Sequence, residues 1–399
     1  MERENDRVAE PGNVTVDAPD DVLRLVPRLR GWRRELHQIP ECDFDLPETI
    51  AYLRAQLEPM GERCDCLRLF SPASSTLCVL FDRGMGAATA LRADMDALPV
   101  TEETGVPFAS RHQGRMHACG HDGHMAMALG ACAWMSEHVD LLPRSVLVVF
   151  QPAEETTGGA RKVCESGVFE RLGVDRIFGF HLWPDLPVAQ VATRAGALLA
   201  ASNETTVEFQ GRASHIAKAS QGRDALLAAC RFVPEAYRYM DERALEEPCL
   251  LKFGHMEAGE VRNQIAAGAR VEGSLRTFSV QMGKRCREEL PGIAERVASD
   301  LGCTARTHFS EGYPPVVNDH EVTSWATGVL RDQGISVEQV PEPLLIAEDF
   351  AWYQQWLPGT FFLLGTGTGI PLHASTFDFD ETILARGVDV YRSLVTATV

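Results

Sequence analysis

Residues 145–151 read SVLVVFQ, a continuous run of apolar and mostly β-branched side chains that ends in one polar residue. The run predicts a strand buried on both faces, because it lacks the alternating polar residues of a half-exposed strand. Strands of this kind are typical of parallel sheets covered by helices. The stretch therefore favours an α/β fold in which helices pack on a largely parallel sheet.

The segments around this strand fit the same fold. Apolar residues at helical spacing predict helices, and short apolar runs predict strands. The predicted helices are 21–37, 48–58 and 124–137, and the predicted strands are 75–81, 88–93 and 176–183. Alternation of this kind indicates a layered α/β domain.

The middle of the chain has a different character. Residues 203–211, NETTVEFQG, alternate like a half-exposed strand, and the elements from there to residue 312 follow the order βαββαβ. This order is the ferredoxin-like pattern, although Pro291 is expected to kink or split its second helix. We therefore expect a disordered lead-in at 1–20, a catalytic domain at 21–197 and 312–399, and an inserted ferredoxin-like domain at 198–311.

Composition excludes several classes of partner. The 399 residues carry a formal net charge of −18, which argues against nucleic acid and anionic membrane surfaces, because both require basic patches. No apolar run reaches the roughly 18 residues of a membrane-spanning helix. The charged N-terminal stretch lacks the apolar region of a signal peptide, and the 11 cysteines follow no regular framework, so we expect a cytoplasmic protein. Cys64 and Cys66 are interpreted as small apolar residues on a strand rather than as a metal site.

Residues 116–125, MHACGHDGHM, crowd several possible metal ligands into one loop. Cys119 and His121 are two residues apart. This spacing cannot place both side chains on one face of a helix, but in a loop both can point toward the same metal. Thiolate and imidazole suit zinc, and less selectively manganese, cobalt or nickel. Asp122 could orient an imidazole from behind the ligands. An incidental cluster remains the alternative.

Three further residues or pairs follow apolar strands. Glu154 and Glu155 come directly after SVLVVFQ, where one carboxylate could bind metal and its neighbour could act as general base. A solvated acidic turn is the alternative for this pair. His181 closes the apolar run GFHLW, and His373 follows a glycine-rich loop. Either histidine, taken alone, could be an ordinary polar residue.

In combination, these segments resemble the zinc-dependent aminoacylase and carboxypeptidase family. The resemblance is strongest to its branch of N-acyl-amino-acid amidohydrolases, which includes hippurate hydrolases and auxin-conjugate hydrolases. It extends over nearly the whole chain after residue 30. The matching stretches are RRELHQIPE (33–41), LRADMDALPV (91–100), MHACGHDGHMAMALG (116–130), FQPAEE (150–155), GFHLWP (179–184), GRASH (211–215), GEVRNQIA (259–266), GSLRTF (273–278), AEDFAWY (347–353) and LHASTFDFDE (372–381).

The resemblance implies two divalent metal ions per subunit, with zinc as the first candidate and manganese, cobalt or nickel as alternatives. It implies Glu154 as the general base and acid, Asp94 and Asp96 as supporting carboxylates, and neither His117 nor His124 as a ligand. Cys119 would bridge the two metals. The implied ligands are Cys119, His121, Glu155, His181 and His373.

For the inserted domain, the resemblance implies dimerisation and substrate binding. Asn263 and Arg276 match substrate-binding positions, and a guanidinium can pair with the α-carboxylate of a substrate. His215 matches a histidine that reaches the reacting carbonyl from the partner subunit of a homodimer. Ala219 and Ser220 stand where the family often has proline and histidine, and no proline follows His373. These departures bear on substrate preference.

The sequence therefore predicts a binuclear metal-dependent amidohydrolase that splits N-acyl-L-amino acids into a carboxylic acid and a free amino acid. A dipeptidase or carboxypeptidase of the same family is the nearest alternative. A cysteine hydrolase that uses Cys119 is another alternative. A catalytically silent binding protein is disfavoured, because Glu154 and every implied ligand position are filled.

Overall fold

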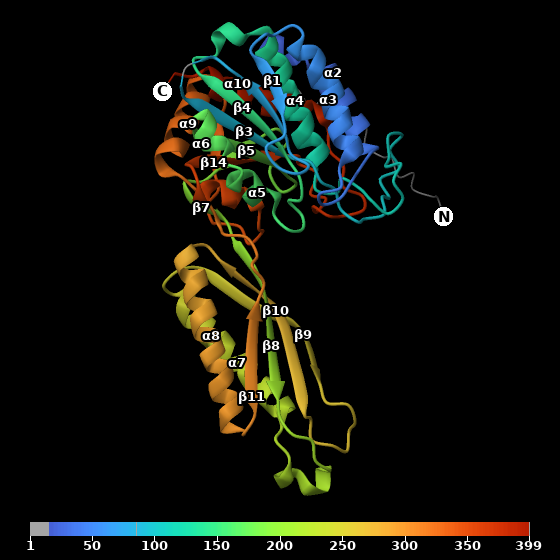
Figure 1. The fold of residues 1–399 in the computed structure, drawn as a ribbon, viewed down its shortest axis with the longest axis vertical. Helices are drawn as coiled ribbons and strands as arrows, with labels where there is room; N and C mark the ends of the chain where they lie inside the picture. The colour runs from blue at the N-terminus through green and yellow to red at the C-terminus, as the bar shows by residue number, and fades with distance from the viewer. Residues whose placement is uncertain (1–15, 85, 399) are drawn as a thin grey trace, which may run out of the picture. The chain divides into compact units, whose positions relative to one another are not determined.

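The computed structural model describes residues 16–84 and 86–398, which divide into two compact units. Unit 1 contains the residues up to Thr193, Asp319–Val340 and the residues from Gln355 onward. Unit 2 contains Arg194–Asn318 and Pro341–Gln354, and Figure 1 draws both units as ribbons. Most of the predicted lead-in (1–20) lies outside the described residues. Within them, Val16 is buried and Asp20 begins a helix.

Unit 1 is built from helices that pack on an eight-stranded sheet. Its α-helices are α1 (Asp20–Leu23), α2 (Val26–His37), α3 (Pro47–Gly61), α4 (His121–Glu137), α5 (Gly159–Glu165), α6 (Val168–Leu172), α9 (His320–Asp332) and α10 (Leu384–Thr396). Its strands are β1 (Leu67–Phe70), β2 (Leu77–Phe81), β3 (Ala88–Asp94), β4 (Ser145–Gln151), β5 (Val174–Trp183), β6 (Val191–Thr193), β13 (Val337–Gln339) and β14 (Gly359–Gly365). Two short 3-10 helices are η1 (Val139–Leu141) and η4 (Glu381–Ile383).

The sheet of unit 1 is parallel at its centre. Its strand order is β1-β2-β4-β3-β5-β14-β6-β13, and β4, β3, β5 and β14 all run in the same direction. The predicted α/β fold with a large, mostly parallel sheet is confirmed, and β4 is buried at every residue, as its sequence indicates. Because these four strands are parallel, their carboxyl ends meet at one edge of the sheet.

Helix α4 is the centre of the core of unit 1. Residues 121–135 are all buried, and the helix packs against α2, α3, α10 and the sheet (Figure 1). It begins at His121 rather than at the predicted His124, because Gly120, with a φ of 83°, turns the chain directly into the helix. No helix in residues 16–84 and 86–398 is long and apolar enough to cross a membrane.

The helix predicted over 21–37 is instead two helices. The chain leaves helical hydrogen bonding between α1 and α2, and a proline occupies the first turn of α2. Proline has no amide hydrogen to donate, so it is tolerated at a helix start and not in the middle.

Unit 2 contains a four-stranded antiparallel sheet with the strand order β11-β8-β10-β9. The elements along the chain are β8 (Ala201–Gln210), η2 (Ile216–Gln221), α7 (Ala225–Ala244), β9 (Cys249–Ala258), β10 (Gly268–Thr277), α8 (Val280–Asp300) and β11 (Thr304–Phe309). Strands and α-helices thus follow the order βαββαβ. Pro291 lies inside α8 but does not split it, because Leu290 and Ile293 on either side pack into the same core as the sheet.

Unit 2 extends beyond the segment 198–311 that the sequence indicated. A small two-stranded sheet joins β7 (Gly196–Leu199) to β12 (Val316–Asn318), and η3 (Asp349–Gln355) follows later in the chain. Segment 341–354 groups with unit 2, and the amide of Ala200 donates to the carbonyls of Leu344 and Ile346, both at 3.0 Å. Such long-range hydrogen bonds leave no local pattern in the sequence.

Candidate metal centre

Polar side chains gather at the carboxyl edge of the parallel strands in unit 1. Glu154 and Glu155 follow β4, His181 lies near the end of β5, and His373 follows β14 after a loop. Cys119 lies two residues before His121, the first residue of α4. Open α/β sheets form their binding sites at this edge, and here it collects residues that are distant in the sequence.

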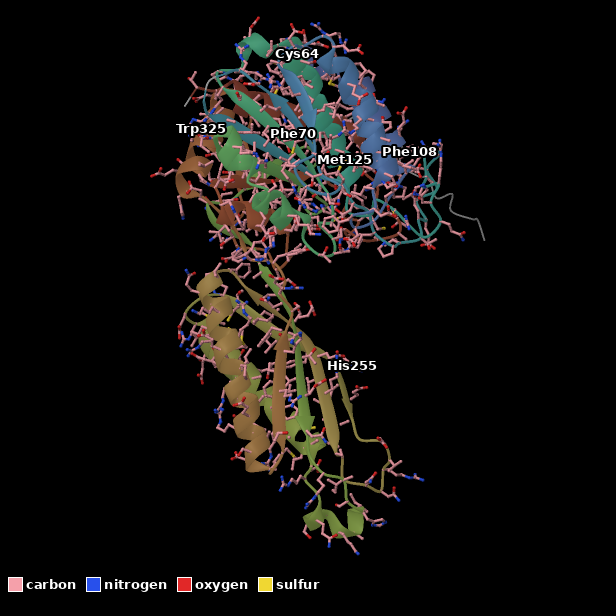
Figure 2. All side chains as sticks on the ribbon, viewed as in Figure 1. Cys64, Phe70, Phe108, Met125, His255 and Trp325 are labelled. Atoms are coloured by element: carbon pink, nitrogen blue, oxygen red, sulfur yellow. The ribbon has the colours of Figure 1, made fainter. Side chains whose placement is uncertain are left out.

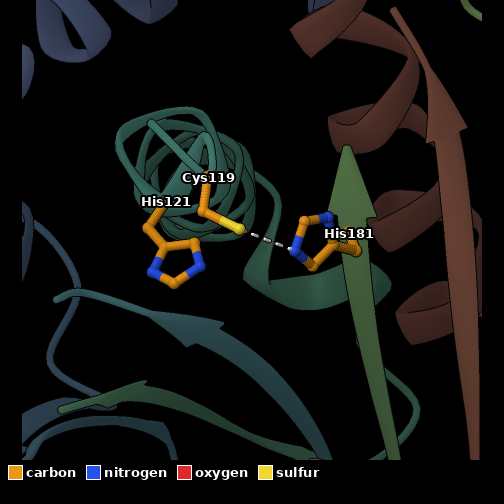
Figure 3. A group of neighbouring side chains, drawn as sticks. All are labelled: Cys119, His121 and His181. Atoms are coloured by element: carbon orange, nitrogen blue, oxygen red, sulfur yellow. Dashed lines mark hydrogen bonds between the residues drawn. The ribbon is translucent and has the colours of Figure 1, made fainter. Parts of the chain in front are cut away.

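Cys119, His121 and His181 form a buried group, which Figure 3 shows. The Sγ atom of Cys119 lies 3.3 Å from Nε2 of His181. One donor atom from each of the three residues lies within 4.8 Å of the other two. One sulfur and two imidazole nitrogens are a donor set that zinc binds well.

A second group shares Cys119 with the first. Its other members are Glu155 and His373, and the three donor atoms again lie within 4.8 Å of one another. Nε2 of His373 is 3.3 Å from Oε1 of Glu155. The amide of His373 donates to the carbonyl of Ala118 at 2.9 Å, which ties its loop to the Cys119 segment. One sulfur common to two donor groups fits a pair of cations with a bridging thiolate.

Hydrogen bonds fix the orientation of the two buried histidines. Nδ1 of His121 donates to the carbonyl of Asp96, and Nδ1 of His181 donates to the carbonyl of Leu182, both at 2.7 Å. Each bond leaves the lone pair on Nε2, which is the arrangement of a metal-binding imidazole. Nε2 of His121 is buried and has no hydrogen-bond partner among the described residues. A buried nitrogen of this kind fits a bound cation.

The neighbouring histidines of the same segment differ. His124 uses both ring nitrogens within the protein: Nδ1 donates to Asp94 at 2.6 Å, and Nε2 accepts from the amide of Leu182 at 2.9 Å. His117 is buried, and neither ring nitrogen has a hydrogen-bond partner among the described residues. Burial lowers the pKa of His117 to about 3, so this imidazole is neutral.

The charges at the site also fit a metal. Burial lowers the pKa of His181 to about 3, so this imidazole is neutral and able to coordinate. Burial raises the pKa of the Cys119 thiol well above its ordinary range, and Glu155 and Glu154 raise it further. A thiolate is therefore favourable here only beside a cation, and the surroundings do not suit a cysteine nucleophile acting alone.

Asp96 holds the turn that carries the two glutamates. Its carboxylate accepts the amide hydrogens of Glu154 at 2.9 Å and of Glu155 at 3.1 Å. The preceding Ala153 has a φ of 58°, a conformation that non-glycine residues adopt at a cost of order 1–3 kcal/mol. The backbone conformation of Ala153 and the two hydrogen bonds to Asp96 together fix the turn from which the side chains of Glu154 and Glu155 extend.

Asp122, which the sequence offered as support for a ligand imidazole, instead binds two residues of α2. Its Oδ2 accepts from Nε of Arg33 and from Nδ1 of His37, both at 2.8 Å. Burial would lower the pKa of His37, but Asp122 and a hydrogen bond to Glu102 outweigh it and raise the pKa to about 9. The sequence prediction missed this network. The only local sign of it is the spacing of four between Arg33 and His37, which places both on one face of a helix.

The three predicted residues of the inserted domain lie in unit 2, at two different places. His215 is exposed and caps η2, where its Nδ1 accepts from the amide of Ala217. The amide of Ile216 donates to the carbonyl of Asn263 at 3.0 Å, so His215 and Asn263 belong to one pair of loops. Arg276 is half-buried near the Thr277 end of β10, whereas the loop that contains Asn263 precedes the Gly268 end.

A family model described as peptidase family M20/M25/M40 matches residues 90–397. The chain belongs to this family. The resemblance that the sequence motifs indicated is confirmed.

Two relatives of this M20-family chain are named as deacetylases. N-acetyl-L-cysteine deacetylase of Bacillus subtilis strain 168 is 33% identical over 372 residues, which cover 92% of this chain and 87% of that protein. N-acetyldiaminopimelate deacetylase of Lacticaseibacillus paracasei is 34% identical over 362 residues, which cover 89% of this chain and 94% of that protein.

A solved structure is similar over the same length. It is the crystal structure of a Bacillus subtilis protein described as a dinuclear metal binding peptidase from the M20 family, and its TM-score is 0.81 at 31% identity. The match covers 94% of this chain and 98% of that chain. The M20-family fold therefore extends over both units of the present chain.

Proposed function

We propose that the protein is a metal-dependent amidohydrolase that cleaves the amide bond of N-acyl-L-amino acids and releases a carboxylic acid and a free amino acid. The proposal rests on the placement of Glu154 beside two donor groups that share the sulfur of Cys119. Relatives named for N-acetyl-L-cysteine and N-acetyldiaminopimelate support the choice of N-acyl amino acids as substrates.

The site is proposed to hold two divalent cations, with Cys119 between them. His121 and His181 would complete one site, and Glu155 and His373 would complete the other. Zinc is the first candidate because sulfur and imidazole donors suit it, and manganese, cobalt and nickel are the alternatives. Bound cations of this kind polarise an amide carbonyl and lower the pKa of water to about 7.

Glu154 is proposed to move the proton. Its side chain is buried next to His121 and Glu155, and Asp96 fixes its backbone amide. From this position its carboxylate would accept a proton from the attacking water and deliver it to the amine that leaves. Proton transfer by a positioned carboxylate typically contributes about 10²–10⁴-fold to the rate.

Arg276 is proposed to bind the α-carboxylate of the substrate. Its Nη1 atom is buried and has no hydrogen-bond partner among the described residues. Burial lowers the pKa of this guanidinium, and the negative charge of Glu204 offsets the effect of burial only in part. A carboxylate that accepts two parallel hydrogen bonds from the guanidinium would supply the missing hydrogen-bond partner.

His215 and Asn263 are proposed to act in the site of a partner subunit within a homodimer. Both belong to loops beyond the Gly268 end of β10, whereas Arg276 lies eight residues further along that strand, about 26 Å away at about 3.3 Å per residue. An N-acyl amino acid with a short acyl group is too small to contact residues that far apart. Two crossed subunits would allow all three residues to act on one substrate.

The free state of the 11 cysteines supports a cytoplasmic location.

A substrate panel assayed with and without metal tests the proposed function. The panel contains N-acetyl, N-benzoyl and longer N-acyl amino acids together with dipeptides. We expect free amino acid to be released from the N-acyl substrates, the activity to be lost on dialysis against a chelator, and a divalent cation to restore it. Full activity in the chelator would contradict the metal site. A preference for dipeptides would make the protein a dipeptidase, which is the nearest alternative.

Substrates in which an amide replaces the α-carboxylate test Arg276. We expect this replacement to reduce kcat/KM strongly in the wild-type enzyme and only slightly in Arg276→Ala, because the variant has already lost the contact. Arg276→Lys is the matched control, since it keeps the charge but not the two-pronged geometry. Equal losses in wild type and Arg276→Ala would remove Arg276 from the substrate contact.

A further inference from the structure

Cys64 and Cys66 lie outside the metal centre, in the turn between α3 and β1. On a strand, residues two apart are spaced about 6.6 Å along the backbone, and their side chains point the same way at about that spacing. The Sγ atoms of this pair are instead 3.0 Å apart. The amide of Leu67 donates to the carbonyl of Cys64 at 2.9 Å and closes a tight turn around the pair. The turn, rather than the predicted strand, brings the two sulfur atoms into contact.

The two thiols differ in accessibility. Cys64, labelled in Figure 2, is 5% exposed and belongs to the hydrophobic core. Cys66 is half-buried at the margin of that core, and its carbonyl accepts the amide hydrogen of Asp82 at 2.9 Å. The pair therefore consists of one thiol that a reagent can reach and one hidden thiol in contact with it.

The geometry suits a disulfide better than a metal. A tetrahedral cation that lies about 2.3 Å from each of two sulfurs holds them about 3.8 Å apart, which is wider than the 3.0 Å of this pair. Cys64 and Cys66 belong to none of the metal-binding groups found among the described residues. A disulfide requires an S–S distance of about 2.05 Å, which rotation of the side chains provides with an approach of about 1 Å.

We propose that Cys64 and Cys66 form a redox-active dithiol that a small-molecule disulfide oxidises to an intramolecular disulfide. With oxidised glutathione, the Cys66 thiolate attacks one glutathione sulfur and expels one glutathione thiolate. Cys64 then loses its proton and attacks the Cys66 sulfur, which expels the second glutathione. Two protein thiols are oxidised to one disulfide, oxidised glutathione is reduced to two thiols, and the two protons pass to those products.

The surroundings of Cys66 affect the rate of this reaction. Burial, together with the contact with Cys64, raises the pKa of the Cys66 thiol to about 12. The thiolate is the attacking species, so the reaction is slow at neutral pH and faster in alkaline buffer.

The test incubates the full-length, metal-loaded protein with oxidised glutathione in mildly alkaline buffer. Acid stops the reaction, N-ethylmaleimide labels the remaining thiols after the denatured protein is returned to neutral pH, and peptide mass spectrometry reads the products. We expect the peptide that contains both cysteines to lose two hydrogen atoms, to take up no label, and to regain both thiols with dithiothreitol. Two labelled thiols, or a stable glutathione adduct on Cys66, would overturn the proposal.

One further thiol and one variant provide the controls. Cys230 is exposed and forms no thiol pair in the described structure, so a glutathione adduct on it shows that the reagent is active. The Cys64→Ser variant keeps Cys66 but removes the second attack, so we expect a stable glutathione adduct on Cys66 there. If the wild type accumulated the same adduct as Cys64→Ser, the two cysteines would only be packing residues.

Discussion

Glu154 and Glu155 both lie near His121, but Glu155 also groups with Cys119 and His373. Oε1 of Glu155 lies 3.8 Å from Nε2 of His121 and 3.3 Å from Nε2 of His373. We expect Glu155→Gln to lose metal affinity, because an amide is a weaker ligand than a carboxylate. We expect Glu154→Gln to keep its metals and to lose kcat by about 10²–10⁴-fold. Metal analysis after dialysis and steady-state kinetics measure the two effects.

A surface glutamate gives the matched control for this pair. Glu165 is exposed and pairs with Arg161 within α5, so Glu165→Gln should change neither metal content nor kcat. A kcat near that of the wild type in Glu154→Gln would show that another group transfers the proton.

Single residues were unequally predictable from the sequence. Cys119, His121 and the glutamate pair attract attention because they directly adjoin elements with strong apolar patterns. The ligand role proposed for His373 follows only from the family resemblance. Arg33 and His37 look like ordinary polar positions of an amphipathic helix. Their burial depends on partners such as Asp122 that come from distant segments.

At the scale of elements, a buried charge network joins α2 to α4. His37 has a pKa raised to about 9, because Asp122 and Glu102 outweigh the effect of burial. In the unfolded chain, its pKa returns to about 6.5. The protonated His37 therefore stabilises the folded protein fully below about pH 6.5, and this contribution is lost as the pH rises to about 9. We expect up to about 3 kcal/mol of unfolding free energy to disappear across that range.

Urea unfolding at several pH values checks this expectation. His37→Gln is the comparison, because glutamine can form hydrogen bonds but cannot titrate. The difference in unfolding free energy between wild type and His37→Gln should shrink as the pH rises through that window. Two parallel stability curves would contradict the pKa assignment.

A glycine supports the turn that carries the glutamates. A Cβ atom at Gly159 would lie 1.9 Å from the carbonyl oxygen of Pro152, so Gly159→Ala must displace the segment that leads into Glu154. We expect a loss of about 1–3 kcal/mol in stability together with lower metal affinity. Thermal unfolding and metal competition with a chelator measure these effects.

Gly31 is the matched control for Gly159. It lies within α2, and a Cβ atom there would meet nothing within 4 Å. Gly31→Ala should therefore raise stability by about 0.5–1 kcal/mol and leave metal affinity unchanged. If Gly159→Ala were as stable as wild type and bound metal equally well, the turn would be more adaptable than its contacts indicate.

The predictability of an element depended on its length. The run SVLVVFQ predicts β4 with its correct bounds, and the centre of the sheet follows from similar runs. The strands β6 and β13 have three residues each, which is too short to show a period. They exist because they pair with neighbouring strands, and the sequence prediction missed both.

At the scale of the whole molecule, the proposed crossed homodimer can be tested by subunit exchange. Glu154→Ala and His215→Ala should each be inactive, because each lacks one residue of a complete site. In a mixed dimer, one site combines both lesions and the other has none. Random pairing makes about half of the dimers mixed, so about a quarter of wild-type activity should return.

Activity measured before and after exchange, with exchange verified by mass spectrometry of tagged subunits, decides the result. Each variant exchanged with itself is the control and should stay inactive. If His215 served the site of its own chain, every site would carry a lesion whatever the pairing, and no activity would return.

Strands β5 and β14 are neighbours in the sheet, although the main segment of unit 2 separates them in the sequence. While the ribosome is still making the chain, β5 therefore has an open edge until Gly359 and the residues after it emerge. The sheet of unit 2 uses β8, β9, β10 and β11, which leave the ribosome one after another and can pair earlier. Open strand edges promote aggregation. Newly made chains would thus depend most on chaperones after β5 has left the ribosome and before β14 has emerged to pair with it.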